Sequence, residues 1–191
     1  MISIQGETMG LFGFIKSVRN EMKKLDTYKK MTVEELKELS DDDLRSALSE
    51  RLIAEEDRNA WEVRECLSSF KGAKKIYYIV NYFDMEVQNG GLCQFFVNSS
   101  RDVAPYVVES LNAIGAINYK ILLNDFVEEH NINLSDLDSF MIEDVEEFEA
   151  QTKRYPFDDF DDKYYELYEK EPLEDLLISY AKKHLEDFKM D

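Results

Sequence analysis

The feature of the sequence that most constrains the fold is a run of apolar side chains at helical spacing, interrupted once by two adjacent glycines. Before the interruption, apolar residues step by three, one, three and four, as on one face of a helix: Ile76, Ile79, Val80, Phe83 and Val87. Asn89, Gly90 and Gly91 then free the backbone to take positive φ, and apolar bulk resumes directly with Leu92. This pattern predicts a sharp corner between two helical segments that is pinned into a core.

A β-hairpin through Asn89-Gly90 is the competing interpretation, because Asn-Gly is a favoured two-residue turn and Tyr77 to Val80 suit a strand. However, residues 77–82 show no alternation of period two. We therefore predict a helix before the glycines and a short helical segment from Leu92 to Val97 after them.

The composition predicts an all-α fold in a single compact multi-helix domain. The 191 residues include only seven glycines and three prolines, fewer turn residues than a β-sandwich needs. Leu11, Phe14, Ile15, Val18, Met22 and Leu25 indicate a short basic amphipathic helix, so we divide the chain into residues 1–30, the tail with this helix, and residues 31–191, the helical domain. Residues 1–8 carry little pattern, and we hypothesise that Met9 is the true start.

Other helix boundaries follow from capping patterns. The S/T-x-x-acid pattern occurs at Thr32, Ser40 and Ser135, and it predicts that a helix starts at each. The helix after Ser135 is expected to bury Leu137, Phe140, Met141, Val145 and Phe148, and the helix after Ser40 to bury Leu44, Leu48, Leu52 and Ile53. Pro105 suits a first helical turn, Gly115 a C-terminal stop, and Pro172 the start of a last helix over Leu173–Phe188 that includes His184 in its core stripe. Trp61 is expected in the core.

The charge is strongly asymmetric along the chain. The net charge is −18, and residues 121–191 alone carry seven cations against twenty-two anions. A field of this sign repels nucleic acid and anionic membranes and attracts cations or basic proteins. A solvated acidic surface that only aids solubility is the alternative.

Several classes of function and location find no support. No apolar run is long enough to span a membrane, and residues 10–15 make a poor signal peptide, so we expect a cytoplasmic protein. Cys66 and Cys93 lack metal-binding or redox spacing, and His130 and His184 form no ligand pair. No nucleotide-binding or hydrolase motif occurs. The aspartates of residues 158–162 suggest loose cation binding at most, because Phe160 interrupts the EF-hand-like spacing. We predict no enzyme, cofactor or dedicated metal site.

Three stretches together resemble a known family: residues 87–98, the segment from Ala104-Pro105 to Gly115-Ala116, and residues 157–165. They are similar to the bacterial DNA-mimic protein domain, otherwise a domain of unknown function, over about residues 70–190. Phe157 and Phe160 replace leucines of that pattern, which leaves a core role intact. The shared motif residues and the helix stop at Gly115 are interpreted as structural: Asn89, Gly90, Gly91, Gln94, Phe95, Phe96, Asn98 and Gly115.

The resemblance implies an all-helical, homodimeric protein whose acidic surface imitates duplex phosphates and occupies the DNA-binding face of a regulator, without a reaction or cofactor. Partner-binding carboxylates must then lie outside the motif, and the candidates are Asp136, Asp138, Glu143, Glu146, Glu147, Glu149, Asp158, Asp159, Asp161 and Asp162. The partner would be a basic DNA-binding protein. An immunity protein or antitoxin that neutralises a basic, nuclease-type toxin fits the same charge and stays open as the alternative.

Overall fold

The computed structural model describes residues 23–58 and 62–190, and these residues form helices and loops without a β-strand. The all-α prediction is confirmed. After a helical segment at residues 23–28, the elements in chain order are α2 (Val33–Lys37), α3 (Asp41–Arg58), α4 (Val63–Ser69), α5 (Gly72–Val97), the 3-10 helix η1 (Ser99–Val103), α6 (Ala104–Ile114), α7 (Ile117–Glu129), η2 (Asp138–Phe140), α8 (Val145–Thr152), α9 (Phe157–Lys170), α10 (Leu173–Lys182) and η3 (Leu185–Phe188).

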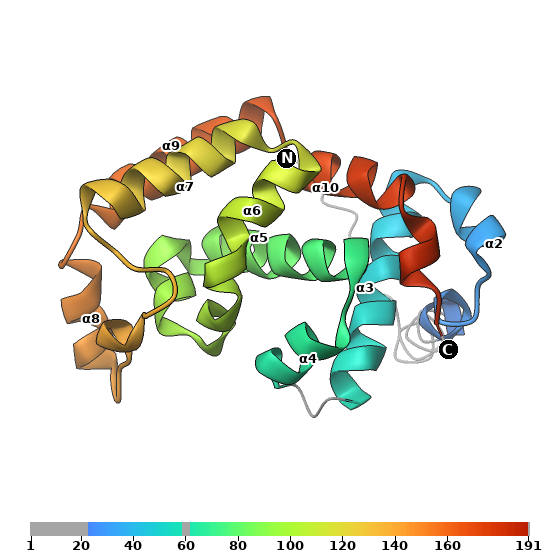
Figure 1. Cartoon of the computed structure of the whole chain (residues 1–191), viewed down its shortest axis with the longest axis horizontal. Helices are drawn as coiled ribbons and strands as arrows, with labels where there is room; N and C mark the ends of the chain where they lie inside the picture. The colour runs from blue at the N-terminus through green and yellow to red at the C-terminus, as the bar shows by residue number, and fades with distance from the viewer. Residues whose placement is uncertain (1–22, 59–61, 191) are drawn as a thin grey trace, which may run out of the picture.

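Helix α5 is the central element of the core. It packs against α6, α9 and α10, and Figure 1 shows it running through the middle of the molecule, with α7 and α9 above one end and α3 and α10 at the other. Its buried side chains include Tyr77, Val80, Phe83 and Val87, so the helix prediction is confirmed and the hairpin is wrong. A helix is the more stable structure here because it places these apolar side chains on one buried face. A strand, with its period of two, would divide them between two faces.

The predicted corner lies inside α5. Gly90 has φ −161° and ψ 20°, and Gly91 has φ 81° and ψ 177°, so the helix is broken between two helical halves. Only Gly91 uses the positive φ that both glycines allow, and its combination of φ and ψ is one that side chains other than glycine essentially never adopt. The halves before and after the break are both buried in the core.

Helix α9 holds this corner in place through three hydrogen bonds. The Asp161 carboxylate accepts the backbone N–H of Leu92 at 2.9 Å, which caps the second half of α5. The Tyr165 hydroxyl donates to the carbonyl oxygen of Val87 at 3.0 Å, at the end of the first half. The Tyr164 hydroxyl donates to the Asp84 carboxylate at 2.6 Å. Because one helix bonds to both sides of the break, the position of α9 is fixed relative to α5.

The caps predicted at Thr32 and Ser40 are confirmed. Thr32 and Glu35 form a reciprocal capping box, and the Ser40 hydroxyl accepts the N–H of Asp43 at 3.2 Å. Leu44, Leu48 and Leu52 are buried, whereas Ile53 is 37% exposed. Trp61, residues 1–8 with Met9, and most of the predicted N-terminal amphipathic helix lie outside the described residues.

A buried arginine joins segments near both ends of the chain. Arg51 of α3 is 1% exposed and donates to the carbonyl oxygens of Tyr28 at 3.1 Å, of Phe188 at 2.8 Å, and of Met31. The carbonyls of Tyr28 and Phe188 lie at the C-terminal ends of a helical segment and of η3, where backbone acceptors lack helical partners, and that of Met31 lies in the loop after the first of these. The guanidinium satisfies them inside the core.

The helix predicted to start at Ser135 is wrong. Asn133 accepts the N–H of Ser135 at 3.0 Å in a local turn, and a regular helix begins only at Val145, where the Asp144 carboxylate accepts the N–H of Glu147. Leu137 and Phe140 are buried as predicted, but Met141 is 59% and Val145 82% exposed. Asparagine and aspartate side chains in this region accept hydrogen bonds from backbone N–H groups and so compete with helix formation. The S/T-x-x-acid pattern takes no account of this competition.

The last predicted helix is too long by six residues. The α10 helix ends at Lys182, and His184 has φ −132°, so the chain continues as the 3-10 helix η3. His184 is exposed and lies against the Tyr180 ring at 4.6 Å, which corrects its predicted place in the core. Leu185 and Phe188 are nevertheless buried, because the tighter turn redirects them inward. The first-turn proline of α6 and the αL stop at Gly115 are as predicted.

Candidate protein-interaction surface

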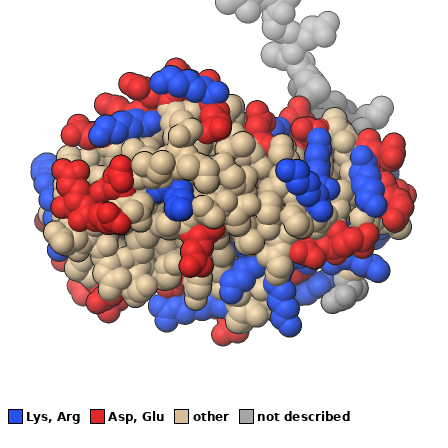
Figure 2. Space-filling model, turned by 45° about the horizontal axis from the view of Figure 1, so that its top comes forward, with Lys and Arg blue, Asp and Glu red and all other residues tan. Residues whose placement is uncertain are grey.

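The predicted carboxylates gather at one end of the molecule, which we call the acidic end: residues 136–149 and residues 157–162. Figure 1 shows α8 and the loop before it at the same end as the start of α9. Apart from Asp161, all of the candidate carboxylates are exposed: Asp136, Asp138, Glu143, Glu146, Glu147, Glu149, Asp158, Asp159 and Asp162. In Figure 2, acidic side chains form a cluster at this end of the view, and several lysine or arginine side chains lie beside it.

The carboxylates of the acidic end are largely without cationic partners. Among the residues that the structure describes, Glu149 is the only one of the ten candidates in an ion pair, with Lys153 at 2.5 Å. The Glu147 carboxylate accepts the backbone N–H of Glu143 at 2.7 Å, and that of Asp136 accepts the N–H of Asp138 at 3.5 Å, which orders the side chains without neutralising them. Most of these carboxylates therefore have no ion pair within the described residues, although Asp138 interacts electrostatically with Arg64 of α4.

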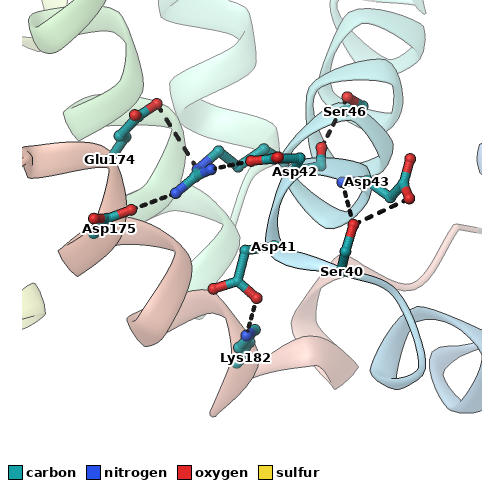
Figure 3. A network of polar contacts seen from close by, with 9 residues as sticks. Ser40, Asp41, Asp42, Asp43, Ser46, Glu174, Asp175 and Lys182 are labelled. Atoms are coloured by element: carbon teal, nitrogen blue, oxygen red, sulfur yellow. Dashed lines mark hydrogen bonds and ion pairs between the residues drawn. The ribbon is translucent and has the colours of Figure 1, made fainter.

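The acidic start of α3 shows the opposite arrangement. There Arg45 reaches Asp42 at 2.8 Å, Glu174 at 3.8 Å and Asp175, while Lys182 pairs with Asp41, so α3 and α10 neutralise each other's charges (Figure 3). Acidic residues alone thus do not distinguish a binding surface from an internal contact. The lack of paired cations is what separates the acidic end from this network.

Asp161 differs from the other candidates in its position. Its carboxylate lies against the corner of α5, where a Cβ added to Gly91 would stand 2.1 Å from Oδ2. Burial raises the pKa of Asp161 to about 6, and the Leu92 hydrogen bond opposes part of that rise. Asp84, on the other side of the corner, also has a pKa raised by burial to about 6. Asp161 is therefore partly buried against the α5 corner, where it caps the second half of α5.

The motif residues assigned a structural role include a hydrogen-bonded set that the sequence analysis missed. The Glu86 carboxylate accepts from Gln94 Nε2 and from Asn98 Nδ2, each at 2.9 Å, which joins the two halves of α5 across the break. A Cβ on Gly90 would lie 2.0 Å from Oε1 of Gln94, so Gly90 leaves the space that this contact needs. The interval of four residues that separates Glu86, Gly90, Gln94 and Asn98 was a signal in the sequence, but the break at Gly90 and Gly91 means that their contact is made across the corner and not along one continuous helix face.

The remaining motif residues support the fold in other ways. Phe95 and Phe96 are fully buried, and Phe95 meets Phe83 edge to face at 5.2 Å. Gly115 ends α6 with φ 85°, whereas Asn89 is exposed at the break. The hydrogen bond between Tyr164 and Asp84 also stabilises the packing of α9 on α5. It was not predicted, because its two residues lie 80 positions apart in the sequence.

A metal site finds no geometric support in the described residues. They contain no group of three or more histidine, cysteine, aspartate or glutamate side chains arranged to hold an ion. Since residues 158–162 form the start of α9, Asp158 and Asp162 share one face of the helix, while Asp159 lies on another face and Asp161 turns inward. Within the described residues, no helix combines the length and hydropathy that a membrane span requires.

Comparison with known proteins supports the motif resemblance. The family model described as DMP19-like protein matches residues 68–184, which is more than half of the chain and extends from α4 to the end of α10. The match covers the glycine corner and all ten candidate carboxylates. No curated protein and no solved structure is significantly similar to the chain. The chain belongs to the DMP19-like protein family, a family of DNA-mimic type domains.

Proposed function

We propose that this protein is a non-enzymatic binding module whose acidic end occupies the DNA-binding face of a basic regulator in place of duplex phosphates. The observation that carries the proposal is the exposure of nine clustered carboxylates, of which only Glu149 has an ion-pair partner among the described residues. An unneutralised surface of this kind attracts a basic protein over a long range and repels nucleic acid.

The spacing of the carboxylates suits this role. Glu146 and Glu149 on α8, and Asp158 and Asp162 on α9, are separated by three or four residues. Such neighbours lie about 5 to 6 Å apart on a helix, and each strand of duplex DNA presents a charge about every 3.4 Å of the helix axis. The two helices therefore present charges at a separation of the same order as that of a nucleic acid backbone.

The rigidity of the support also favours the proposal. Helix α9 is tied to both sides of the α5 corner, and α8 contacts α5 as well. Carboxylates on a fixed framework lose less conformational freedom on binding than carboxylates on a mobile tail. Homodimerisation and a cytoplasmic location remain predictions of the sequence.

The test is capture of a partner from the lysate of the source cell on the immobilised full chain, compared with the triple variant Glu143→Gln, Glu146→Gln and Glu147→Gln. The matched control neutralises three exposed acids elsewhere, Glu38→Gln, Glu65→Gln and Glu109→Gln, and so changes the net charge equally. We expect wild type and control to retain a basic DNA-binding protein that the triple variant loses and that duplex DNA or high salt elutes.

Two outcomes would contradict the proposal. Capture that is equal for the triple variant and wild type would show that the acidic end does not bind the partner. Capture of a basic toxin whose binding duplex DNA does not compete with would favour the immunity-protein alternative.

A further inference from the structure

A groove between α7 and α9 combines apolar walls with an acidic rim. It has a volume of about 360 Å³. Leu122 and Phe126 of α7 and Phe160 of α9 form its apolar part. Asp125, Glu129 and Asp159 line it with carboxylates, and none of the three has an ion pair among the described residues, although Lys163 also lines the groove. An apolar floor is not needed for phosphate mimicry, so this groove requires a separate explanation.

The exposed face of α7 also combines apolar and acidic side chains. Ile117 and Ile121 are 46% and 50% exposed, one turn apart, and Asp125 and Glu129 follow at the same interval of four. These four residues share one face, with an apolar pair at one end and an acidic pair at the other. Large apolar side chains that are about half exposed on one helix face suit a contact with another molecule.

We propose that the α7–α9 groove docks a basic amphipathic helix of the protein partner, with apolar side chains against Ile117 and Ile121 and lysine or arginine against Asp125, Glu129 and Asp159. This inference rests on the proposed function and specifies the structural element of the partner, a helix, that binds here. Charge complementarity supports it, because the rim carries three carboxylates against Lys163. A helix fits this groove because its own side chains also repeat once per turn, like the residues at intervals of four along α7.

Binding through this groove differs from binding through the acidic end in its response to salt. Attraction between exposed charges weakens as ionic strength rises, whereas burial of apolar side chains does not. The groove would therefore contribute a part of the affinity that changes little with salt, beside the larger salt-sensitive part from the acidic end, and it would select partners that carry apolar residues beside their basic ones.

The test uses the full chain and a fluorescein-labelled model helix that carries two leucines one turn apart, followed by two arginines one turn apart. A second peptide replaces the leucines with glutamines and keeps the charge. Fluorescence anisotropy should show that wild type binds the second peptide at least about tenfold more weakly, as expected when two aliphatic contacts are lost. Ile121→Gln should weaken binding of the first peptide to a similar degree in both low and high salt.

Control variants separate this inference from the proposed function. Met85→Gln makes the same apolar-to-polar change at an exposed residue outside the groove and should leave peptide binding unchanged. The Glu143, Glu146 and Glu147 triple variant should bind the peptide as tightly as the control that neutralises Glu38, Glu65 and Glu109. If it does so but captures no regulator, the inference stands independently of the acidic end.

Three results would overturn the inference. One is equal affinity for the two peptides, and another is unchanged binding by Ile121→Gln when its melting curve shows a folded protein. The third is concentration-dependent dimerisation of wild type, measured by sedimentation, that Ile121→Gln abolishes. That result would assign the groove to a second copy of the chain instead.

Discussion

Asp161 accepts the backbone N–H of Leu92 at 2.9 Å, across 69 residues of sequence. The bond caps the second half of α5 with a carboxylate from α9, at the point where Gly91 breaks the helix. Because the same helix begins with the exposed Asp158 and Asp159, the glycine corner determines where part of the acidic end is displayed. A motif of the core can thus control the geometry of the proposed binding surface.

Gly91→Ala should destabilise the protein strongly. Its φ of 81° with ψ of 177° is strained for any side chain, and the new Cβ would meet Oδ2 of Asp161 at 2.1 Å. We expect a loss of about 3 kcal/mol in the free energy of unfolding, at the upper end of the cost of such strain. Urea denaturation followed by far-UV circular dichroism measures this loss.

Gly115→Ala is the matched control for that substitution. Gly115 also has a positive φ, 85°, but a Cβ there would meet nothing within 4 Å. The expected loss is about 1 kcal/mol, the strain of the left-handed conformation alone. Equal losses for the two variants would mean that the Asp161 contact contributes little.

Stability should rise as the pH falls from 7 to 5. Burial raises the pKa of Asp84 and of Asp161 to about 6, above the value near 4 expected in the unfolded chain. The folded protein therefore binds these protons more tightly, and the stability gained from protonation is lost as the pH rises through 6. For Asp84, the more buried of the two, the difference between pH 5 and pH 7 is about 1 kcal/mol.

Denaturant titrations at several pH values measure this effect. Asp84→Asn should flatten the change between pH 5 and pH 7. The pKa of Asp43, lowered to about 2 by its hydrogen bonds with Lys24, Tyr28 and Ser40, affects stability only at lower pH and does not interfere. Stability that falls steadily from pH 7 to pH 5 in wild type would contradict the prediction.

Arg51→Met should destabilise the junction of the two chain ends by at least about 2 kcal/mol. The substitution keeps much of the side-chain volume but removes the guanidinium donors to the carbonyls of Tyr28, Met31 and Phe188, of which that of Tyr28 retains the backbone N–H of Met31. Arg51→Lys should recover only part of the loss, because an ammonium cannot reproduce the planar set of donors. Thermal unfolding compares the two variants, and full recovery by lysine would show that charge, not geometry, matters here.

Local signals predicted much of the fold. The helices around the glycine corner, the caps at Thr32 and Ser40, and the stop at Gly115 each depend on residues within one or two turns, which a sequence pattern captures. The pattern failed at Ser135, where a nearby asparagine offered a competing turn, and at His184, where the helix tightens. Both errors concern local alternatives of similar energy.

The candidate surface could be predicted in composition but not in arrangement. Exposure of the carboxylates at residues 136–149 follows from their charge. The inward turn of Asp161 depends on α9 packing against the α5 corner, and no spacing within residues 157–162 indicates it. The groove between α7 and α9 likewise exists only when segments about 35 residues apart meet.

The most direct test of the proposed function is whether this protein and duplex DNA compete for the captured regulator. A labelled duplex bound to that regulator should be displaced by wild type and by the Glu38, Glu65 and Glu109 control, whereas the Glu143, Glu146 and Glu147 triple variant should displace it at least about tenfold less well. A ternary complex in which the regulator holds duplex DNA and this protein together would contradict mimicry.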